Sequence, residues 1–397
     1  MSTEPSITVN DREELIYLLT EAAEFEHVVM CTYLYAQWSL KKHESEGITK
    51  AEKNAIDGWR AALRAVALEE MLHLTLVNNL LAAFGAAPHL ARPDFPIPQG
   101  YFPSALDFHL APFNEETMQH FVFIEHPEGI EVRDGEGFAH ESHYERVICS
   151  DLLTPTSRDY DTQGHLYHGI AQAIRRLAAE LGEDRLFVGH GEAQLSSSEF
   201  PLPGLFEVTG VESALKALEE IVTQGEGAPA HREDSHYARF EQVRCELVAM
   251  KQARPDFEPA LPAALNPVLT EFADDVKVTR VSNERARRVV DVGNSVYGLM
   301  LHTHGECAID LFLAQQRPDT PEAEDGGALR AFDGPECAVV VGDAGSRGVE
   351  QVRGILLEGS EPMLWIAVEH EGTQGRHEHH LVCVPDHAVG LLEASDQ

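Results

Sequence analysis

Basic residues are scarce in this 397-residue sequence, which has 30 Lys and Arg against 66 Asp and Glu and a formal net charge of −36. A field of that sign repels polyanions, so we do not expect nucleic acid as a partner. The acidic balance also has a simpler interpretation, because net charge keeps a protein soluble whatever its function.

Closely spaced cysteines are missing as well. The sequence has no CxxC pair, and its single cysteines are too widely spread for the disulfide framework of a small secreted protein. We therefore expect reduced thiols in a cytoplasmic protein. The six cysteines are Cys31, Cys149, Cys245, Cys307, Cys337 and Cys383.

Long apolar runs and several common catalytic motifs are also lacking. Residues 1–15 are polar and acidic, and nowhere do about 18 apolar residues follow one another, so we expect neither a signal peptide nor a membrane span. The motifs GxGxxG, GxxxxGK[ST], GxSxG and HExxH do not occur. Nucleotide-binding, α/β-hydrolase and zincin assignments therefore have no local support.

What the sequence does contain is helical periodicity in two pairs of segments. Apolar residues recur at steps of three and four over about 11–42, after a possible N-cap at Asn10, and again over 63–84. The same spacing returns over 211–224 and about 232–251. Each pair has a short connection, which makes its helices antiparallel neighbours. Two such hairpins predict a mainly α protein built on a four-helix bundle.

The remaining segments differ in texture. Residues 89–210 begin with a proline-rich stretch and contain one clear helical segment, so they are interpreted as a long insertion packed on the bundle. A fifth helix is expected over 284–305, and Val-, Gly- and turn-rich sequence follows. The expected organisation is bundle helices 1 and 2 in 1–88, the insertion in 89–210, helices 3 to 5 in 211–316 and a small β-rich C-terminal appendage in 317–397.

Ionisable residues interrupt the apolar stripes of the first hairpin. Glu70 and His73 lie three residues apart on one face of the second helix, where together they can bind one ion. Glu26 lies on the stripe of the first helix, at a similar height in an antiparallel pair. A charge that faces a bundle core is costly unless it is paired or coordinated. The three residues therefore predict half of a buried site.

The second hairpin repeats this arrangement. Glu233 and His236 form another Glu-x-x-His pair, and Glu226 is the lone carboxylate of the partner helix, with Glu219 or Glu220 as alternatives. One Glu from each of two helices and one Glu-x-x-His from each of the others is the pattern of di-iron and di-manganese bundles. Metal-free hydrogen bonds or ion pairs are the alternative interpretation. The expected ligands are Glu26, Glu70, His73, Glu226, Glu233 and His236.

Several neighbours of these residues are interpreted more cautiously. Glu69 and His27 adjoin ligand candidates but point about 100° away on a helix, so we expect them behind the ligands or at the surface. Tyr33 fits a core position, with a redox role near a metal as the alternative. His126 is a lone histidine without an assigned role.

Four segments resemble a known family over roughly residues 10–305. They are LTEAAEFEHVVMCTYLYAQWSL, EEMLHLTLVNNLLAAFG with FPIPQGYFP after it, IVTQGEG, and SHYARF. They are similar to the ferritin-like domain of iminophenyl-pyruvate dimer synthases, the family that includes chromopyrrolate- and violacein-type synthases. The resemblance implies a ferritin-like four-helix bundle, with a long insertion between helices 2 and 3. It also implies oxidative coupling of imines derived from aromatic amino acids, and oxygen or peroxide chemistry at iron.

These observations together favour a non-haem di-metal oxidoreductase of secondary metabolism. Its expected cofactors are two metal ions, iron or else manganese, with dioxygen or peroxide as oxidant. Its expected partner is a small amine, imine or amino-acid-derived substrate, without a membrane, and a homo-oligomer is left open. Two rivals remain: a non-enzymatic metal-binding or iron-storage protein on the same fold, and a scaffold whose site has lost its metal.

Overall fold

The fold was analysed in a computed structural model of the chain. The described residues are 7–97, 101–102, 107–127, 130–138, 160, 162–198, 200–225, 234–270, 277–315, 336–337, 351–353, 355–356, 364–371 and 377–384. The chain divides into two compact units, Met1–Pro318 and Asp319–Gln397. The first is helical, and the described strands β3 to β7 belong to the second. The domain boundaries expected from the sequence stay predictions.

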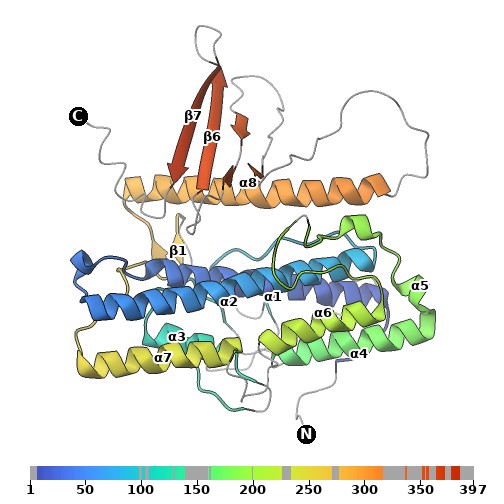
Figure 1. The fold of residues 1–397 in the computed structure, drawn as a ribbon, viewed down its shortest axis with the longest axis horizontal. Helices are drawn as coiled ribbons and strands as arrows, with labels where there is room; N and C mark the ends of the chain where they lie inside the picture. The colour runs from blue at the N-terminus through green and yellow to red at the C-terminus, as the bar shows by residue number, and fades with distance from the viewer. Residues whose placement is uncertain are drawn as a thin grey trace. The chain divides into compact units, whose positions relative to one another are not determined.

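Two long helices form the first layer of the helical unit (Figure 1). They are α1 (Arg12–Ser39) and α2 (Lys50–Ala83). Arg12, at the start of α1, donates through Nε to the carbonyl of Phe84 at the end of α2, at 2.9 Å, so the two helices run antiparallel. The N-cap of α1 is Asp11 rather than Asn10, because the Asp11 side chain accepts from the backbone N–H of Glu14 at 2.8 Å.

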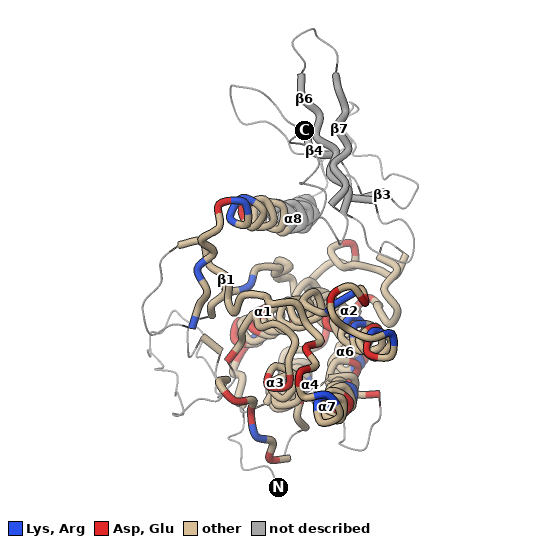
Figure 2. Tube along the Cα trace, turned by 90° about the vertical axis from the view of Figure 1, so that its left-hand side faces the viewer, with Lys and Arg blue, Asp and Glu red and all other residues tan. Residues whose placement is uncertain are grey.

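Four shorter helices form a second layer against this hairpin (Figures 1 and 2). Helix α3 (Glu115–Ile124) packs on α7 (His236–Ala253), and α4 (Gln163–Leu181) packs on α6 (Val211–Gln224). Helices α6 and α7 both contact α2, and α4 contacts α1. The insertion thus supplies two helices that complete the bundle, of 10 residues in α3 and 19 in α4 against 28 in α1.

The apolar core is divided into two clusters, one on each side of the middle of the hairpin. One joins residues 15–23 of α1 and 72–84 of α2 to α4 and α6. The other joins 25–40 of α1 and 56–66 of α2 to α3 and α7, with Trp59 stacked on Phe113. A polar stretch of both long helices therefore lies at the junction between two water-excluding cores.

The smaller elements of the helical unit follow the chain. They are η1 (Glu44–Glu46), α5 (Glu183–Leu186), η2 (Gly191–Ala193) and the parallel pair β1 (Pro267–Val268) and β2 (Thr279–Arg280). The unit also contains a third long helix, α8 (Glu284–Gln315). The expected fifth helix is α8. In the end-on view α8 lies on the opposite side of α1 from α3, α4 and α7 (Figure 2). None of the helices in the described residues is long and apolar enough to cross a membrane.

The C-terminal unit contains antiparallel strands, as predicted for a β-rich appendage. Strand β6 (Leu364–Glu371) lies between β4 (Gln351–Arg353) and β7 (His377–Val384), with Leu364 opposite Val384. Strand β3 (Glu336–Cys337) pairs with β5 (Ile355–Leu356).

Candidate metal centre

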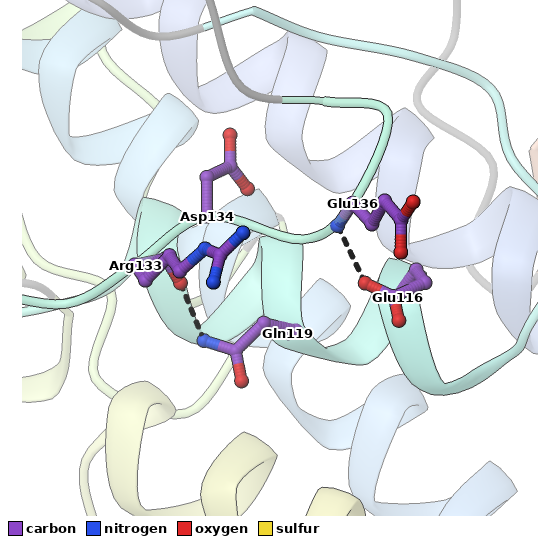
Figure 3. Close-up of a pocket in the computed structure, with 5 residues that line it drawn as sticks. All are labelled: Glu116, Gln119, Arg133, Asp134 and Glu136. Carbon is purple, nitrogen blue, oxygen red and sulfur yellow. Dashed lines mark hydrogen bonds between the residues drawn. The ribbon is translucent and has the colours of Figure 1, made fainter.

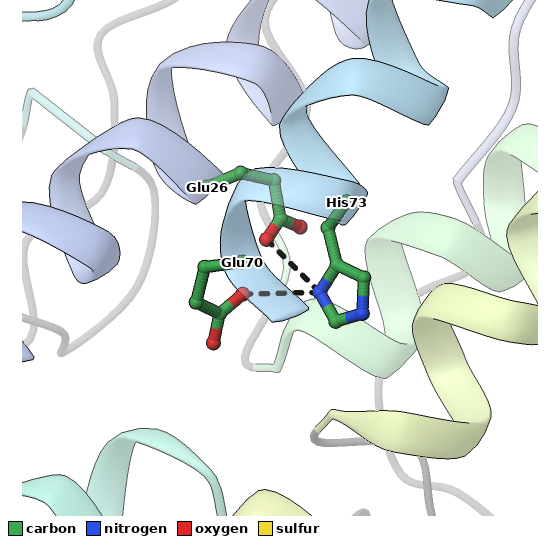
Figure 4. Close-up of side chains that lie close together, drawn as sticks. All are labelled: Glu26, Glu70 and His73. Carbon is green, nitrogen blue, oxygen red and sulfur yellow. Dashed lines mark hydrogen bonds and ion pairs between the residues drawn. The ribbon is translucent and has the colours of Figure 1, made fainter. Parts of the chain in front are cut away.

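Three of the predicted ligands meet at the middle of the α1–α2 hairpin (Figure 4). Nδ1 of His73 lies 3.0 Å from Oε2 of Glu70 and 3.5 Å from Oε2 of Glu26. All three side chains are at most 2% exposed. The antiparallel pairing predicted from the sequence therefore brings Glu26 to the height of Glu70, at the junction of the two apolar clusters.

A second group of the same composition shares Glu70 with the first. Nδ1 of His236 lies 3.0 Å from Oε1 of Glu70 and 3.5 Å from Oε2 of Glu125. In each group one ligand atom per residue lies within 4.8 Å of the others. Two sets of two carboxylates and one imidazole thus meet on a common carboxylate.

The ends of the four shorter helices converge on these groups. Glu125 directly follows the last residue of α3, Gln224 is the last residue of α6, and His236 is the first residue of α7. Tyr167 lies in the first turns of α4. Helix α7 begins here because the Ser235 side chain accepts from the backbone N–H of Ala238. Breaks in the second layer therefore bring polar side chains to the buried junction.

A tyrosine holds each outer carboxylate. The Tyr167 hydroxyl donates to Oε1 of Glu26, and the Tyr33 hydroxyl donates to Oε1 of Glu125. The other oxygen, Oε2, is buried in both carboxylates without a hydrogen-bond donor in the described residues. Each outer carboxylate thus keeps one oxygen for another partner, and buried polar atoms without partners are rare in proteins.

The two imidazoles are oriented from behind in the same way. Nε2 of His73 donates to Oε1 of Gln224 at 3.0 Å, and Nε2 of His236 donates to Oε2 of Glu69 at 2.8 Å. Gln224 is itself held by Glu220, whose carboxylate accepts from its amide at 2.6 Å. These bonds keep one proton of each ring on Nε2, so that loss of the Nδ1 proton would leave an Nδ1 lone pair facing the carboxylates, as metal ligation requires.

Burial and mutual charge shift the titration of the cluster. Burial, with the Glu70 carboxylate adding to it, raises the pKa of Glu26 to about 8. Burial also acts to raise the pKa of Glu70, but His236 and His73 hold it below its usual range. Burial alone would lower the pKa of His73, yet Glu26 and Glu70 raise it to about 10. Without a metal, protons on the imidazoles therefore balance the buried carboxylates.

The donor set fits a pair of divalent metal ions. Carboxylate oxygen and imidazole nitrogen are the donors that suit iron and manganese. The partnerless Oε2 atoms of Glu26 and Glu125, together with Nδ1 of His236, face the interior of the cluster rather than a protein donor with good hydrogen-bond geometry. Ions held by Glu26, His73, Glu70, Glu125 and His236 would satisfy all of these atoms.

The other predicted site residues have different outcomes. Glu226 and Glu233 lie outside the described residues, so their ligation stays a prediction. Glu219 is exposed, and Glu220 lies behind Gln224, so neither joins the cluster. His27 points away from the cluster, with Nδ1 donating to the carbonyl of Leu90 at 2.9 Å.

Glu125 is the member of the cluster that sequence reasoning missed. It lies in the insertion, next to His126, whose Nδ1 contacts only the carbonyl of Phe123 among the described hydrogen bonds. A signal was present, because Met118, Phe121 and Glu125 follow helical spacing and place Glu125 on the apolar stripe of α3. The stripe reasoning used for Glu26 would have found it.

A separate surface hollow lies beside α3 (Figure 3). Its walls include Glu116, Asp134 and Glu136. Their groups already bond within the protein: Oε2 of Glu116 accepts from the backbone of Glu136, and Oδ1 of Asp134 accepts from His120 at 2.8 Å. Among the described residues, the groups of three or more potential metal ligands lie at Glu70 and not in this hollow.

Comparison with known proteins places this geometry in a family. A family model described as ferritin-like matches residues 19–245, more than half of the chain. A solved ferritin-like protein from Caulobacter vibrioides is 20% identical, with a TM-score of 0.39 over 65% of this chain and 76% of that chain.

Two curated relatives match over most of this chain. The 2-imino-3-(indol-3-yl)propanoate dimerase of Chromobacterium violaceum is 30% identical over 312 residues, or 74% of this chain and 28% of that protein. The dichlorochromopyrrolate synthase of Lentzea aerocolonigenes is 27% identical over 340 residues, or 75% and 32%. The chain spans about a third of the length of these enzymes. Because the family model covers more than half of the chain, the protein belongs to the ferritin-like family.

Proposed function

We propose that the protein is a non-haem di-iron oxidoreductase that oxidises a small amine, imine or amino-acid-derived substrate. The observation that carries the proposal is the doubled ligand set that shares Glu70. Glu26 and His73 would hold one ion, Glu125 and His236 the other, and Glu70 would bridge them. When bound, such a pair of irons supplies the oxidising equivalents of dioxygen or peroxide to the substrate.

The described side chains align the carboxylates and exclude water at this centre. Tyr33 and Tyr167 fix the two outer carboxylates, so that one oxygen of each would be available to a bound ion. The apolar clusters on either side exclude water from the junction. Each ion would be held by two carboxylates and one imidazole of the described residues, and a bound ion would supply Lewis-acid and redox chemistry there.

The names of the relatives support a narrower substrate class. One relative is named for dimerising an indole-bearing imino acid and the other for making dichlorochromopyrrolate. We propose that this chain also couples imines derived from aromatic amino acids, with a small-molecule substrate as its partner rather than a membrane or nucleic acid. The setting would be the cytoplasm.

Metal analysis tests the centre itself. Protein expressed in iron-supplemented medium should hold about two irons per chain. Glu70→Ala should lose most of both, because both positions share its carboxylate, and His236→Ala should lose about one. Equal and negligible metal in the wild type and both variants would overturn the proposal.

Turnover separates an oxidase from a storage protein. In the presence of an aromatic 2-imino acid generated in place by an amino-acid oxidase, the iron-loaded protein should form a coupled dimer of the imine that the oxidase alone, which itself reduces dioxygen to peroxide, does not form. The turnover rate of His236→Ala, which lacks one metal ligand, should be at least about 100-fold lower than that of the wild type. Iron uptake with mineral formation and no loss of imine would instead indicate storage.

A further inference from the structure

The centre has two halves, one with Glu26 and His73 and the other with Glu125 and His236. The two halves have the same contacts at Nδ1 of the histidine and at the outer carboxylate, and within the described part of the chain they differ only in the group that accepts from Nε2 of the histidine. Each half has an imidazole Nδ1 at 3.0 Å from Glu70 and 3.5 Å from an outer carboxylate. Each outer carboxylate accepts from one tyrosine. Among the described residues, a difference in metal affinity between the halves must therefore come from farther out.

The groups behind the histidines differ in charge. His73 donates to the neutral amide of Gln224, whereas His236 donates to the carboxylate of Glu69. The structure also fixes both partners. Arg239, one turn after His236 on α7, donates to both oxygens of Glu69, and Glu220 accepts from the amide of Gln224.

A carboxylate behind a metal-bound imidazole makes the imidazole a stronger donor than an amide does. It accepts the Nε2 proton more strongly and so increases electron density at Nδ1, and loss of such a partner typically lowers metal affinity ~10–100-fold. Arg239 reduces the net charge of Glu69 but leaves Oε2 in contact with Nε2 of His236.

We propose that the two metal positions are unequal, with the position at Glu125 and His236 binding its ion more tightly and filling first. Glu69 is the positioning residue that creates the difference, and Gln224 keeps the other position weaker. This inference rests on the metal-binding part of the proposed function.

Titration of the metal-free protein with Co²⁺ under anaerobic conditions tests the inference. Calorimetry of the wild type should resolve two steps whose affinities differ at least ~10-fold. Glu69→Gln keeps the shape and the hydrogen bond but makes the group neutral, as at Gln224. It should weaken the first step ~10–100-fold and leave the second unchanged, so that the steps merge.

The matched reverse change is Gln224→Glu in a Glu220→Gln background, because the new carboxylate would otherwise meet that of Glu220 at the present 2.6 Å contact. It should strengthen only the second step, and the addition of Glu69→Gln should give two steps again with the order of filling reversed. Circular dichroism and thermal unfolding establish that each variant is folded. If Glu69→Gln does not fold, the affinity of the second Co²⁺ step in Gln224→Glu tests the inference by itself.

The outcomes distinguish this inference from the proposed function. Two Co²⁺ ions bound with equal affinity by the wild type would overturn the inequality and leave the di-metal centre standing. An unchanged second step in Gln224→Glu would overturn the role of the group behind the histidine. Absence of any Co²⁺ binding would overturn the metal centre and this inference with it.

Discussion

The two tyrosines of the centre show how much a single hydroxyl can control at a buried site. The pKa of Tyr167 lies well above its usual value, because of burial and the neighbouring Glu26, so the hydroxyl stays a donor. Its hydrogen bond aligns one oxygen of Glu26 and leaves the other facing the cluster.

Replacement of this hydroxyl should affect both stability and metal affinity. Tyr167→Phe leaves Oε1 of Glu26 buried without its donor, which should cost about 1–3 kcal/mol of unfolding free energy in the metal-free protein. It should also weaken metal binding ~10–100-fold. Urea unfolding and Co²⁺ titration measure the two effects.

Tyr160→Phe is a matched control for that change. Tyr160 is also buried and donates to a carboxylate, that of Glu21, at 2.8 Å. It should lose similar stability yet keep wild-type metal affinity. Equal loss of affinity in both variants would mean that general destabilisation, not alignment of Glu26, explains the effect.

Metal binding should release protons, because the cluster is protonated without metal. The pKa of His73 is raised to about 10 and that of Glu26 to about 8, and both residues must lose their protons to ligate. His236, whose pKa is raised well above its usual value, must do so as well. We expect about two to three protons released per centre at about pH 7, and affinity that rises with pH. Calorimetry in buffers of different ionisation enthalpy counts the protons, and a buffer-independent heat would contradict the expectation.

At the scale of elements, the long hairpin depends on a close contact at the end of α2. Gly189 donates to the carbonyl of Ala83 at 3.0 Å, and a Cβ at Gly189 would lie 1.7 Å from the carbonyl oxygen of Ala82. Backbone passes over backbone there, so no flexible side chain can move aside.

Gly189→Ala should therefore destabilise the protein by about 1–3 kcal/mol or more through backbone displacement. Gly191→Ala is the control, since a Cβ there meets nothing within 4 Å, and it should stay within about 0.5 kcal/mol of the wild type. Denaturant unfolding compares the two. A similar midpoint for both variants would refute the importance of the contact.

Elements with strong local periodicity were predictable from the sequence, and long-range partners were not. The hairpin of α1 and α2 and the helices α6 and α7 follow the apolar spacing, as does the stripe position of Glu26, Glu70 and His73. Helix α3 follows proline-rich sequence and pairs with α7, which lies more than a hundred residues later, so local spacing did not indicate its place in the bundle. That is why Glu125 was missed.

At the scale of the helical unit, a bound metal should join the two apolar clusters into a more stable whole. The candidate ligands from α1, α2, the end of α3 and α7 meet at one point, so a metal ion would bind the folded state and not the separated helices. A free ion at about 100 times its dissociation constant raises the free energy of unfolding by about 2.7 kcal/mol.

Metal removal should therefore lower the unfolding temperature, and more so as the pH rises. His73 contributes to metal-free stability fully below its unfolded pKa of about 6.5, and that contribution is lost as the pH rises through about 10. Differential scanning calorimetry with and without chelator measures the difference in unfolding temperature at each pH. Glu70→Ala, which lacks the shared ligand, should show no chelator effect, and a persistent effect would place the responsible metal elsewhere.

The convergence of helix ends has a consequence for how such a protein can diverge. The chain leaves the second layer directly after Glu125 and after Gln224, and it re-enters just before His236. Connecting segments accept insertions and substitutions far more readily than packed helices do. New sequence at these connections, apart from the predicted ligands Glu226 and Glu233, can therefore change what is bound beside the cluster, while Glu26, Glu70 and His73 stay fixed on the long hairpin.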